Sequence, residues 1–228
     1  GDVYKRQLLY TISNAPTLAE STILRNIYKQ FSMIDHLKIL EVERLIGHDI
    51  KAIEYFLRTK IFNHSHIHFG LTSQDINNTA IPLVLKEWFN EEYLPAIQKL
   101  INAMEDICDY EKVPMLARIH GQVATPTYFH KEINVFAYRI REQIKLLKSI
   151  PFTGKFGGAV GNLSAHKLAY PDVNWEKFAD NFLDYIGLKR QQCTTQVENY
   201  DNLAAFFDGL RRVNTILLDF SRDMWQYI

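Results

Sequence analysis

The sequence predicts an all-α fold, in which a bundle of long helices follows a smaller helical region. Glycine and proline are scarce, at 10 and 7 of 228 residues, and hydrophobic residues recur at the three- and four-residue spacing of one helical face. Three of these periodic stretches are long for a compact domain. Because 47% of the residues are hydrophobic, the chain has ample apolar surface for a folded core of one or two domains.

The first helical region covers residues 18–60 and carries its own hydrophobic stripe through Ile50, Ile53 and Phe56. It is shorter than the helices that follow, and we place a domain boundary near Asn63. We therefore expect a helical N-terminal domain at 1–62 and a central long-helix bundle domain at 63–228.

Three long amphipathic helices are expected in the second domain. The first covers 85–107 and must kink at Pro95, because proline lacks a backbone N–H and its ring clashes with the preceding turn. The second, at 127–149, extends about 35 Å at the rise of an α-helix. The third, at 203–228, keeps its rhythm with no glycine or proline stop, so we expect the natural protein to continue. Helices with such broad apolar stripes favour an oligomer.

Charge and cysteine content exclude several classes of protein. Lysine plus arginine equals aspartate plus glutamate at 26 each, so no long-range positive field draws the chain onto nucleic acid or an anionic membrane. No apolar run approaches the roughly 20 residues of a membrane span, and residues 1–10 are too polar for a signal peptide. Cys108 and Cys193 lie far apart and frame no disulfide scaffold, which favours the cytoplasm.

Three polar loops interrupt the helices, at 47–49, 68–78 and 118–126, and contain His48, His68 and His120. Histidine is the side chain whose ordinary pKa suits proton transfer near neutrality. Three histidines in polar turns therefore indicate a candidate site.

Each loop also has a purely structural interpretation. Thr72 with Asp75 fits a capping box at a helix start, and Thr125-Pro126 resembles a helix N-cap followed by proline at the first helical position. Asp49 fits a first-turn charge that complements the helix dipole. Taken singly, each loop is explained by these caps.

Other kinds of site receive less support. His64, His66 and His68 alternate along an extended segment, as zinc ligands can, but no further ligand is identifiable, so we predict no metal site. No nucleophile elbow of the GxSxG type is present. The glycine-rich stretch 154–161 matches neither phosphate-binding fingerprint, which favours a tight connection where backbones approach closely.

Five motifs follow one another along the chain: GHDIKAIEYFL at 47–57, TSQDINN at 72–78, RIHGQVATP at 118–126, GAVGN at 158–162 and TTQVE at 194–198. In this order and at this spacing they resemble those of the adenylosuccinate lyase family of the fumarase and aspartase superfamily. The resemblance covers residues 41–228 and is greatest to the variety found in many bacteria.

This resemblance implies an all-α fold, a homotetramer built around a shared helix bundle, and active sites assembled from several subunits. The implied reaction is elimination of fumarate from adenylosuccinate to leave AMP, and from the succinylcarboxamide ribotide earlier in purine synthesis. A base removes a C–H proton beside a carboxylate, and a general acid protonates the departing nitrogen. The family requires no cofactor.

The resemblance also implies roles for individual residues. His120 matches the histidine that donates a proton to the leaving group. His48 matches one that orients the substrate or its phosphate, and His68 matches a histidine near the site. The remaining matches are residues that bind substrate. They are Gly47 and Asp49 in the turn around His48, the hydroxyl residues Thr72 and Ser73, and the amide residue Gln196.

The sequence departs from the family pattern in three places. The mobile loop Gly-Ser-Ser-x-Met-Pro-x-Lys-x-Asn-Pro, which supplies the catalytic base, does not occur in residues 1–228, so we expect it beyond them and expect the 228 residues alone to be inactive. Residues 1–12 do not match the family's start and suggest foreign sequence. Gly47 stands where relatives often have asparagine. An argininosuccinate lyase-like enzyme and a non-catalytic helical oligomerisation module remain the alternatives.

Overall fold

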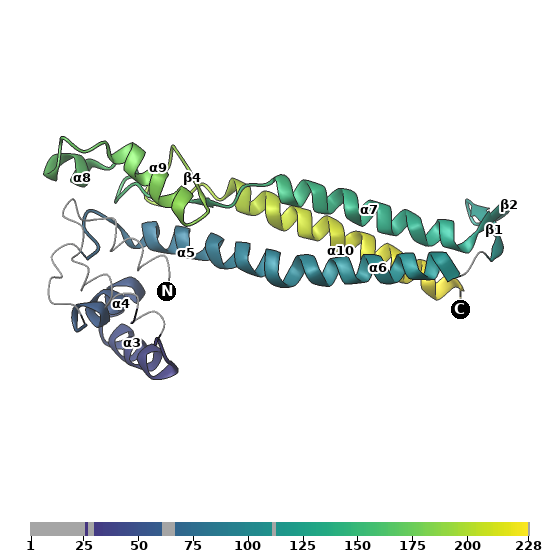
Figure 1. Cartoon of the computed structure of the whole chain (residues 1–228), viewed down its shortest axis with the longest axis horizontal. Helices are drawn as coiled ribbons and strands as arrows, with labels where there is room; N and C mark the ends of the chain where they lie inside the picture. The colour runs from purple at the N-terminus through teal and green to yellow at the C-terminus, as the bar shows by residue number, and fades with distance from the viewer. Residues whose placement is uncertain (1–25, 27–29, 61–66, 111–112, 228) are drawn as a thin grey trace. The chain divides into compact units, whose positions relative to one another are not determined.

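The computed structural model describes residues 26, 30–60, 67–110 and 113–227, without the side chains of 108–110 (Figure 1). The predicted all-α fold is confirmed, since helices dominate and only four short strands occur among the described residues. The helices are α3 Met33–Ile46, α4 Asp49–Arg58, α5 Ser73–Trp88, η1 Phe89–Tyr93, α6 Leu94–Tyr110, α7 Phe129–Ser149, α8 Ser164–Ala169, α9 Trp175–Tyr185 and α10 Asp201–Tyr227. The strands are β1 Pro114–Ile119, β2 Gln122–Tyr128, β3 Thr153–Gly154 and β4 Lys189–Arg190.

The chain divides into two compact units, which are described separately. Unit 1 combines Gly1–Val84 with Phe152–Asn199, and unit 2 combines Leu85–Pro151 with Tyr200–Ile228. Both units are discontinuous in sequence, unlike the consecutive domains expected at 1–62 and 63–228. The boundary expected near Asn63 lies outside the described residues, as do residues 1–12 and the histidines at 64 and 66. In the part that is described, every helix is too short or too polar to cross a membrane.

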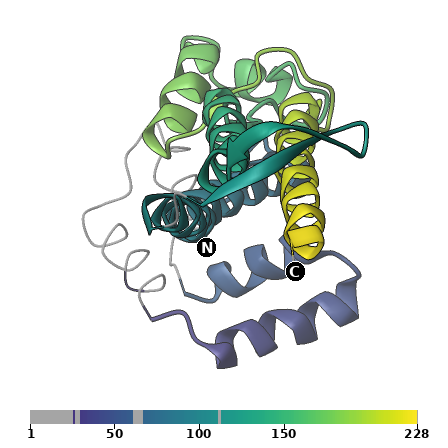
Figure 2. The ribbon, with the colours of Figure 1, turned by 90° about the vertical axis from the view of Figure 1, so that its right-hand side faces the viewer.

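Unit 2 is the bundle of long helices that the sequence predicts. Helix α7 packs against both α6 and α10 (Figure 2). Its buried residues follow the three- and four-residue spacing of one helical face, and they are Ile133, Phe136, Ala137, Ile140, Ile144 and Leu147. Facing residues of the neighbouring helices complete this core, namely Ile97, Ile101 and Met104 of α6, and Phe206, Val213 and Ile216 of α10.

The break expected at Pro95 takes the form of a π-helix. Phe89–Tyr93 forms a π-helical turn, in which the Leu94 N–H donates to the Phe89 carbonyl oxygen five residues earlier. Such a wide turn separates the proline ring from the carbonyl that it would meet in a regular α-helix. The helical path therefore continues through Pro95.

The expected helix start at Thr125-Pro126 is wrong, because these residues belong to a β-hairpin. Strands β1 and β2 pair antiparallel around a two-residue turn, and α7 begins only at Phe129. His120 and Gly121 occupy this turn with φ of 50° and 76°, the left-handed conformation that favours glycine at hairpin turns. In Figure 2 the hairpin lies toward the viewer, in front of the helices of unit 2.

Unit 1 has two hydrophobic clusters. One joins α3 and α4 to the first turns of α5, and its buried residues include Ile39, Ile50, Phe56 and Ile76. The other surrounds α9 and includes Phe156, Trp175, Phe182 and Leu183. Strands β3 and β4 pair in parallel, which places Lys189 and Arg190 beside Thr153 and Gly154 at the start of the glycine-rich stretch.

Candidate functional site

The first turn of α5 gathers polar residues from distant parts of unit 1. Thr72 directly precedes this helix, and its backbone N–H donates to Asp75 Oδ2 at 2.8 Å. The carboxylate half of the expected capping box is therefore present. The Thr72 hydroxyl has another partner, because Gln196 Nε2 donates to Thr72 Oγ1 at 3.4 Å. Two residues 124 positions apart, both predicted to bind substrate, thus meet beside Ser73, the first residue of α5.

The turn at 47–49 connects two helices and reaches the same helix. Gly47 ends α3 with φ of 67°, and His48 caps α4 by accepting the Lys51 N–H on Nδ1 at 3.3 Å. Asp49 Oδ1 lies 3.5 Å from the same nitrogen. Asn77 Nδ2 of α5 donates to Asp49 Oδ2 at 3.3 Å. The cap interpretation of this turn is correct, and the turn also lies against α5.

His68 is a mostly buried histidine with a left-handed backbone, at φ of 64°. Its Nδ1 lies 3.4 Å from Glu54 Oε2, and Glu54 also contacts Lys51 and Arg58 at 2.7 and 2.6 Å. Burial lowers the pKa of His68, although the charge of Glu54 opposes this shift. Burial alone would raise the pKa of Glu54, but the bond from Lys51 and the surrounding positive charges outweigh it and lower that pKa. The arrangement favours a neutral His68 beside an ionised Glu54.

Seven of the eight predicted site residues therefore belong to unit 1, and His120 belongs to unit 2. His120 is exposed at the turn of the β-hairpin. Within unit 1 the structure brings together Thr72, Ser73 and Gln196, and it brings Asp49 to α5. It does not bring His120 to them within one unit.

Sequence reasoning missed Lys155. This lysine is fully buried, and its Nζ lies 2.8 Å from Asp75 Oδ1. The sequence offered one signal, a lysine directly after the first glycine of the glycine-rich stretch 154–161. That stretch was predicted to bring backbones close together, and this is confirmed, because a Cβ at Gly161 would lie 2.1 Å from the Thr194 carbonyl oxygen.

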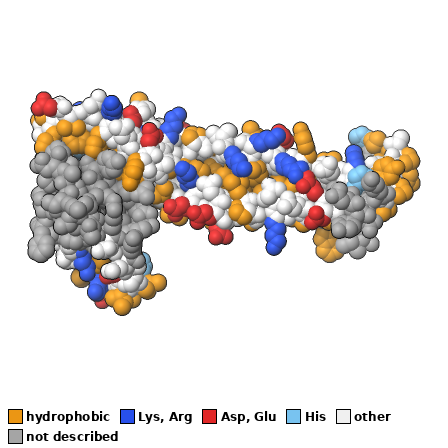
Figure 3. Space-filling view, in the orientation of Figure 1, with side chains coloured by type: hydrophobic (Ala, Val, Ile, Leu, Met, Phe, Trp, Pro, Cys, Tyr) orange, Lys and Arg blue, Asp and Glu red, His pale blue; other side chains and the backbone are white. Residues whose placement is uncertain are grey.

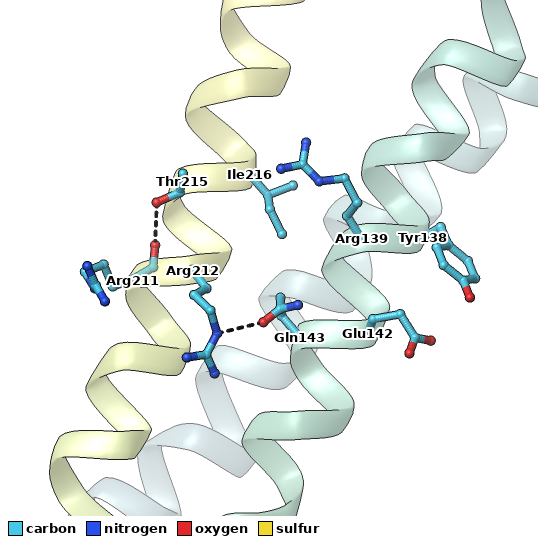
Figure 4. Close-up of a pocket in the computed structure, with 8 residues that line it drawn as sticks. All are labelled: Tyr138, Arg139, Glu142, Gln143, Arg211, Arg212, Thr215 and Ile216. Carbon is cyan, nitrogen blue, oxygen red and sulfur yellow. Dashed lines mark hydrogen bonds between the residues drawn. The ribbon is translucent and has the colours of Figure 1, made fainter.

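Unit 2 has an open groove of about 400 Å³ between α7 and α10 (Figure 4). Arg139, Arg211 and Arg212 line it, and Arg212 Nε donates to Gln143 Oε1 at 2.8 Å. The other two arginines pair with Asp219 and Asp208, both at 3.1 Å. The groove contains none of the predicted site residues. Two of its three arginines already form ion pairs with aspartates.

Comparisons with known proteins agree with the motifs. The chain is 46% identical over 218 residues to the adenylosuccinate lyase of Dictyostelium discoideum, covering 90% of this chain and 47% of that protein. It is 41% identical over 227 residues to the adenylosuccinate lyase of Escherichia coli K12, covering 95% and 50%. The chain thus spans about half the length of these curated relatives.

Solved structures share the fold. A fumarate lyase from Mesorhizobium sp. BNC1 matches 97% of this chain and 53% of its own, with a TM-score of 0.81 and 17% identity. The β-carboxy-cis,cis-muconate cycloisomerase of Acinetobacter calcoaceticus sp. ADP1 matches 98% and 52%, with a TM-score of 0.77 and 19% identity. The family model described as lyase matches residues 13–228, and the chain therefore belongs to the lyase family.

Proposed function

We propose that the complete gene product eliminates fumarate from adenylosuccinate, giving AMP, and from the succinylcarboxamide ribotide of purine synthesis. The observation that carries this proposal is the contact of Gln196 with Thr72 at the start of α5. An amide and two hydroxyls, gathered at a helix N-terminus, are donors that suit an anionic substrate. The identity to curated adenylosuccinate lyases supports the same reaction.

In this proposal the residues divide the chemistry between binding and proton transfer. Thr72 and Ser73 hold the substrate carboxylates, and Gln196 binds beside them. His48 orients the substrate from the turn that contacts α5. His120 is the general acid that protonates the departing nitrogen, which carries the negative charge released when the C–N bond breaks. The base is a serine of the mobile loop, which residues 1–228 do not contain.

We also infer a cytoplasmic homotetramer with shared active sites. Unit 2 exposes large hydrophobic side chains on its helices and hairpin (Figure 3), including Ile119, Val123, Tyr138, Leu218 and Trp225. Such residues are stabilised when another chain covers them. The free, exposed Cys193 fits a reducing compartment. Light scattering on the complete gene product measures the oligomeric state, and a monomer would contradict the inferred tetramer.

An absorbance assay of fumarate release from adenylosuccinate, carried out with the complete gene product, tests this function. We expect turnover that falls by about 100-fold or more in His120→Ala, because a general acid contributes 10² to 10⁴ in rate. Argininosuccinate serves as the control substrate, since it undergoes the same elimination from a different leaving group. Turnover of argininosuccinate alone contradicts the assigned substrate, and turnover of neither points to a non-catalytic helical module.

A further inference from the structure

A carboxylate and an ammonium group are buried together beneath the candidate site of unit 1. Asp75 and Lys155 are both fully buried, and Lys155 Nζ lies 2.8 Å from Asp75 Oδ1. Removing both charges from water costs several kcal/mol for each ion. Replacement of such a pair by packed hydrophobic residues is often neutral or stabilising. Stability alone therefore does not account for this pair.

The contacts of Asp75 reach two separate loops. Its Oδ2 accepts the Thr72 N–H at 2.8 Å, directly before the hydroxyl residues of the site. Its Oδ1 accepts the Gly157 N–H at 2.8 Å, and the Gly158 N–H lies 3.2 and 3.1 Å from the two oxygens. One carboxylate thus fixes the start of α5 and the glycine-rich stretch together.

Lys155 fastens the same stretch from within. Its Nζ also donates to the Gly158 carbonyl oxygen at 2.8 Å, while the Thr79 hydroxyl of α5 donates to the Lys155 carbonyl oxygen at 3.0 Å. Beyond this turn, Gly161 lies against the backbone of Thr194 and Thr195. The glycine-rich stretch therefore connects the start of α5 to the residues directly before Gln196.

We propose that Asp75 and Lys155 are positioning residues, whose buried pair sets the distance between Thr72 and Gln196. This inference rests on the proposed function, because it assigns the pair to the substrate-binding side of that reaction. The backbone amides held by Asp75 place the Thr72 hydroxyl, and the turn held by Lys155 places the loop of Gln196. Neither side chain touches the substrate.

Asp75→Asn in the complete gene product tests the proposal with little change of shape. Whichever way the new amide is oriented, its NH₂ group faces a backbone N–H that the carboxylate had accepted. We expect kcat/KM for adenylosuccinate to fall by about 100-fold, the size of effect that a shift of about 1 Å produces. In a Thr72→Ala background, Asp75→Asn should cost clearly less than it does alone, because part of its effect acts through the Thr72 hydroxyl. Full additivity of the two changes overturns the proposal.

Asp180→Asn is the matched control. Asp180 accepts from Arg190 Nε at 2.6 Å and from Gln192 Nε2 at 2.9 Å in the same unit, and neither partner is a predicted site residue. The control should lower the unfolding midpoint but leave KM and kcat unchanged. Equal kinetic losses in both variants would assign Asp75 to stability alone and overturn the proposal.

Amide hydrogen exchange separates this proposal from the proposed function. In Asp75→Asn the amides of Thr72, Gly157 and Gly158 should exchange together about tenfold faster or more, whereas Asp180→Asn should leave them unchanged. This readout needs no substrate. If the unaltered protein releases no fumarate, the proposed function fails. Unchanged exchange in Asp75→Asn overturns the positioning role whatever the reaction is.

Discussion

The ring of His166 lies in an aromatic surrounding in unit 1, fully buried. Its centroid is 4.8 Å from that of Trp175 and 5.6 Å from those of Phe69 and Phe156. Burial lowers the pKa of His166 below its usual value, and the charge of Asp75 and a backbone hydrogen bond with Phe69 oppose this shift only in part. This histidine is therefore neutral in the folded state at neutral pH.

The depressed pKa of His166 predicts a loss of stability on mild acidification. Unfolded histidine takes up a proton below the ordinary value of 6.5, and folded His166 does so only at lower pH. The unfolded state binds more protons in that window, so stability falls as the pH drops below about 6.5. The variant His166→Phe should flatten the dependence of the urea midpoint between about pH 7.5 and 5.5. His68 shifts in the same direction and leaves a residual slope. An unchanged slope contradicts the prediction.

Two glycines with a left-handed backbone should differ in tolerance. Gly161 and Gly47 have φ of 80° and 67°. An added Cβ at Gly161 would lie 2.1 Å from the Thr194 carbonyl oxygen, whereas a Cβ at Gly47 would have no other atom within 4 Å. We expect Gly47→Ala to cost about 1 kcal/mol from backbone conformation alone. Gly161→Ala should cost about 4 kcal/mol, because backbone must move. Urea unfolding of both variants checks this, and equal losses would contradict the clash.

Helices α7 and α10 approach each other closely at Gly209. A Cβ there would lie 2.4 Å from Leu147 Cδ2, in the buried face of α7. Alanine normally stabilises a helix interior by about 0.5–1 kcal/mol over glycine. Here we expect Gly209→Ala to destabilise by about 1–3 kcal/mol through overpacking. Leu147→Ala makes room for the new methyl group, so the double variant should cost less than the sum of the single losses. An additive double-mutant cycle would show that this contact does not set the spacing.

Long helices could be predicted from sequence, and the hairpin between two of them was not. Sustained three- and four-residue periodicity identified α7 and α10 nearly to their ends, because a helix buries one face along its whole length. The hairpin β1–β2 is short and largely exposed, so it leaves no such pattern. Thr125-Pro126 matched a helix cap, but the His120-Gly121 turn and strand pairing determined the conformation.

Without the family motifs, local sequence patterns indicate the candidate site only where its residues cap or begin a helix. Asp49 and Thr72 stand at helix starts, where short polar side chains are conspicuous in sequence. The pair of Asp75 and Lys155 was missed because its partners are 80 positions apart. Asp75 alone resembles an ordinary helix cap, and a local pattern contains no information about a distant cation.

At the scale of the whole molecule, the 228 residues alone should bind ligand without turning over substrate. Unit 1 contains seven of the eight predicted site residues, whereas the expected base loop does not occur in the sequence. We therefore expect AMP with fumarate to raise the midpoint of heat unfolding, since a ligand that binds only the folded state stabilises it. Gln196→Ala should abolish this rise, and no rise in the unaltered chain would contradict a nucleotide site in these loops. Measurable turnover would refute the assignment of the base.

The discontinuity of unit 1 constrains the order of folding during synthesis. The segment Leu85–Pro151 belongs to unit 2 and separates the two halves of unit 1. Asp75 leaves the ribosome 80 residues before Lys155. At a synthesis rate of about 5–20 residues per second, Lys155 is synthesised about 4–16 s after Asp75. Until then Asp75 at the start of α5 lacks its contacts with Lys155 and with the backbone N–H groups of Gly157 and Gly158. Helices α3 and α4 can pair during this interval, whereas the arrangement that joins Thr72 to Gln196 forms only after unit 2 has begun to emerge.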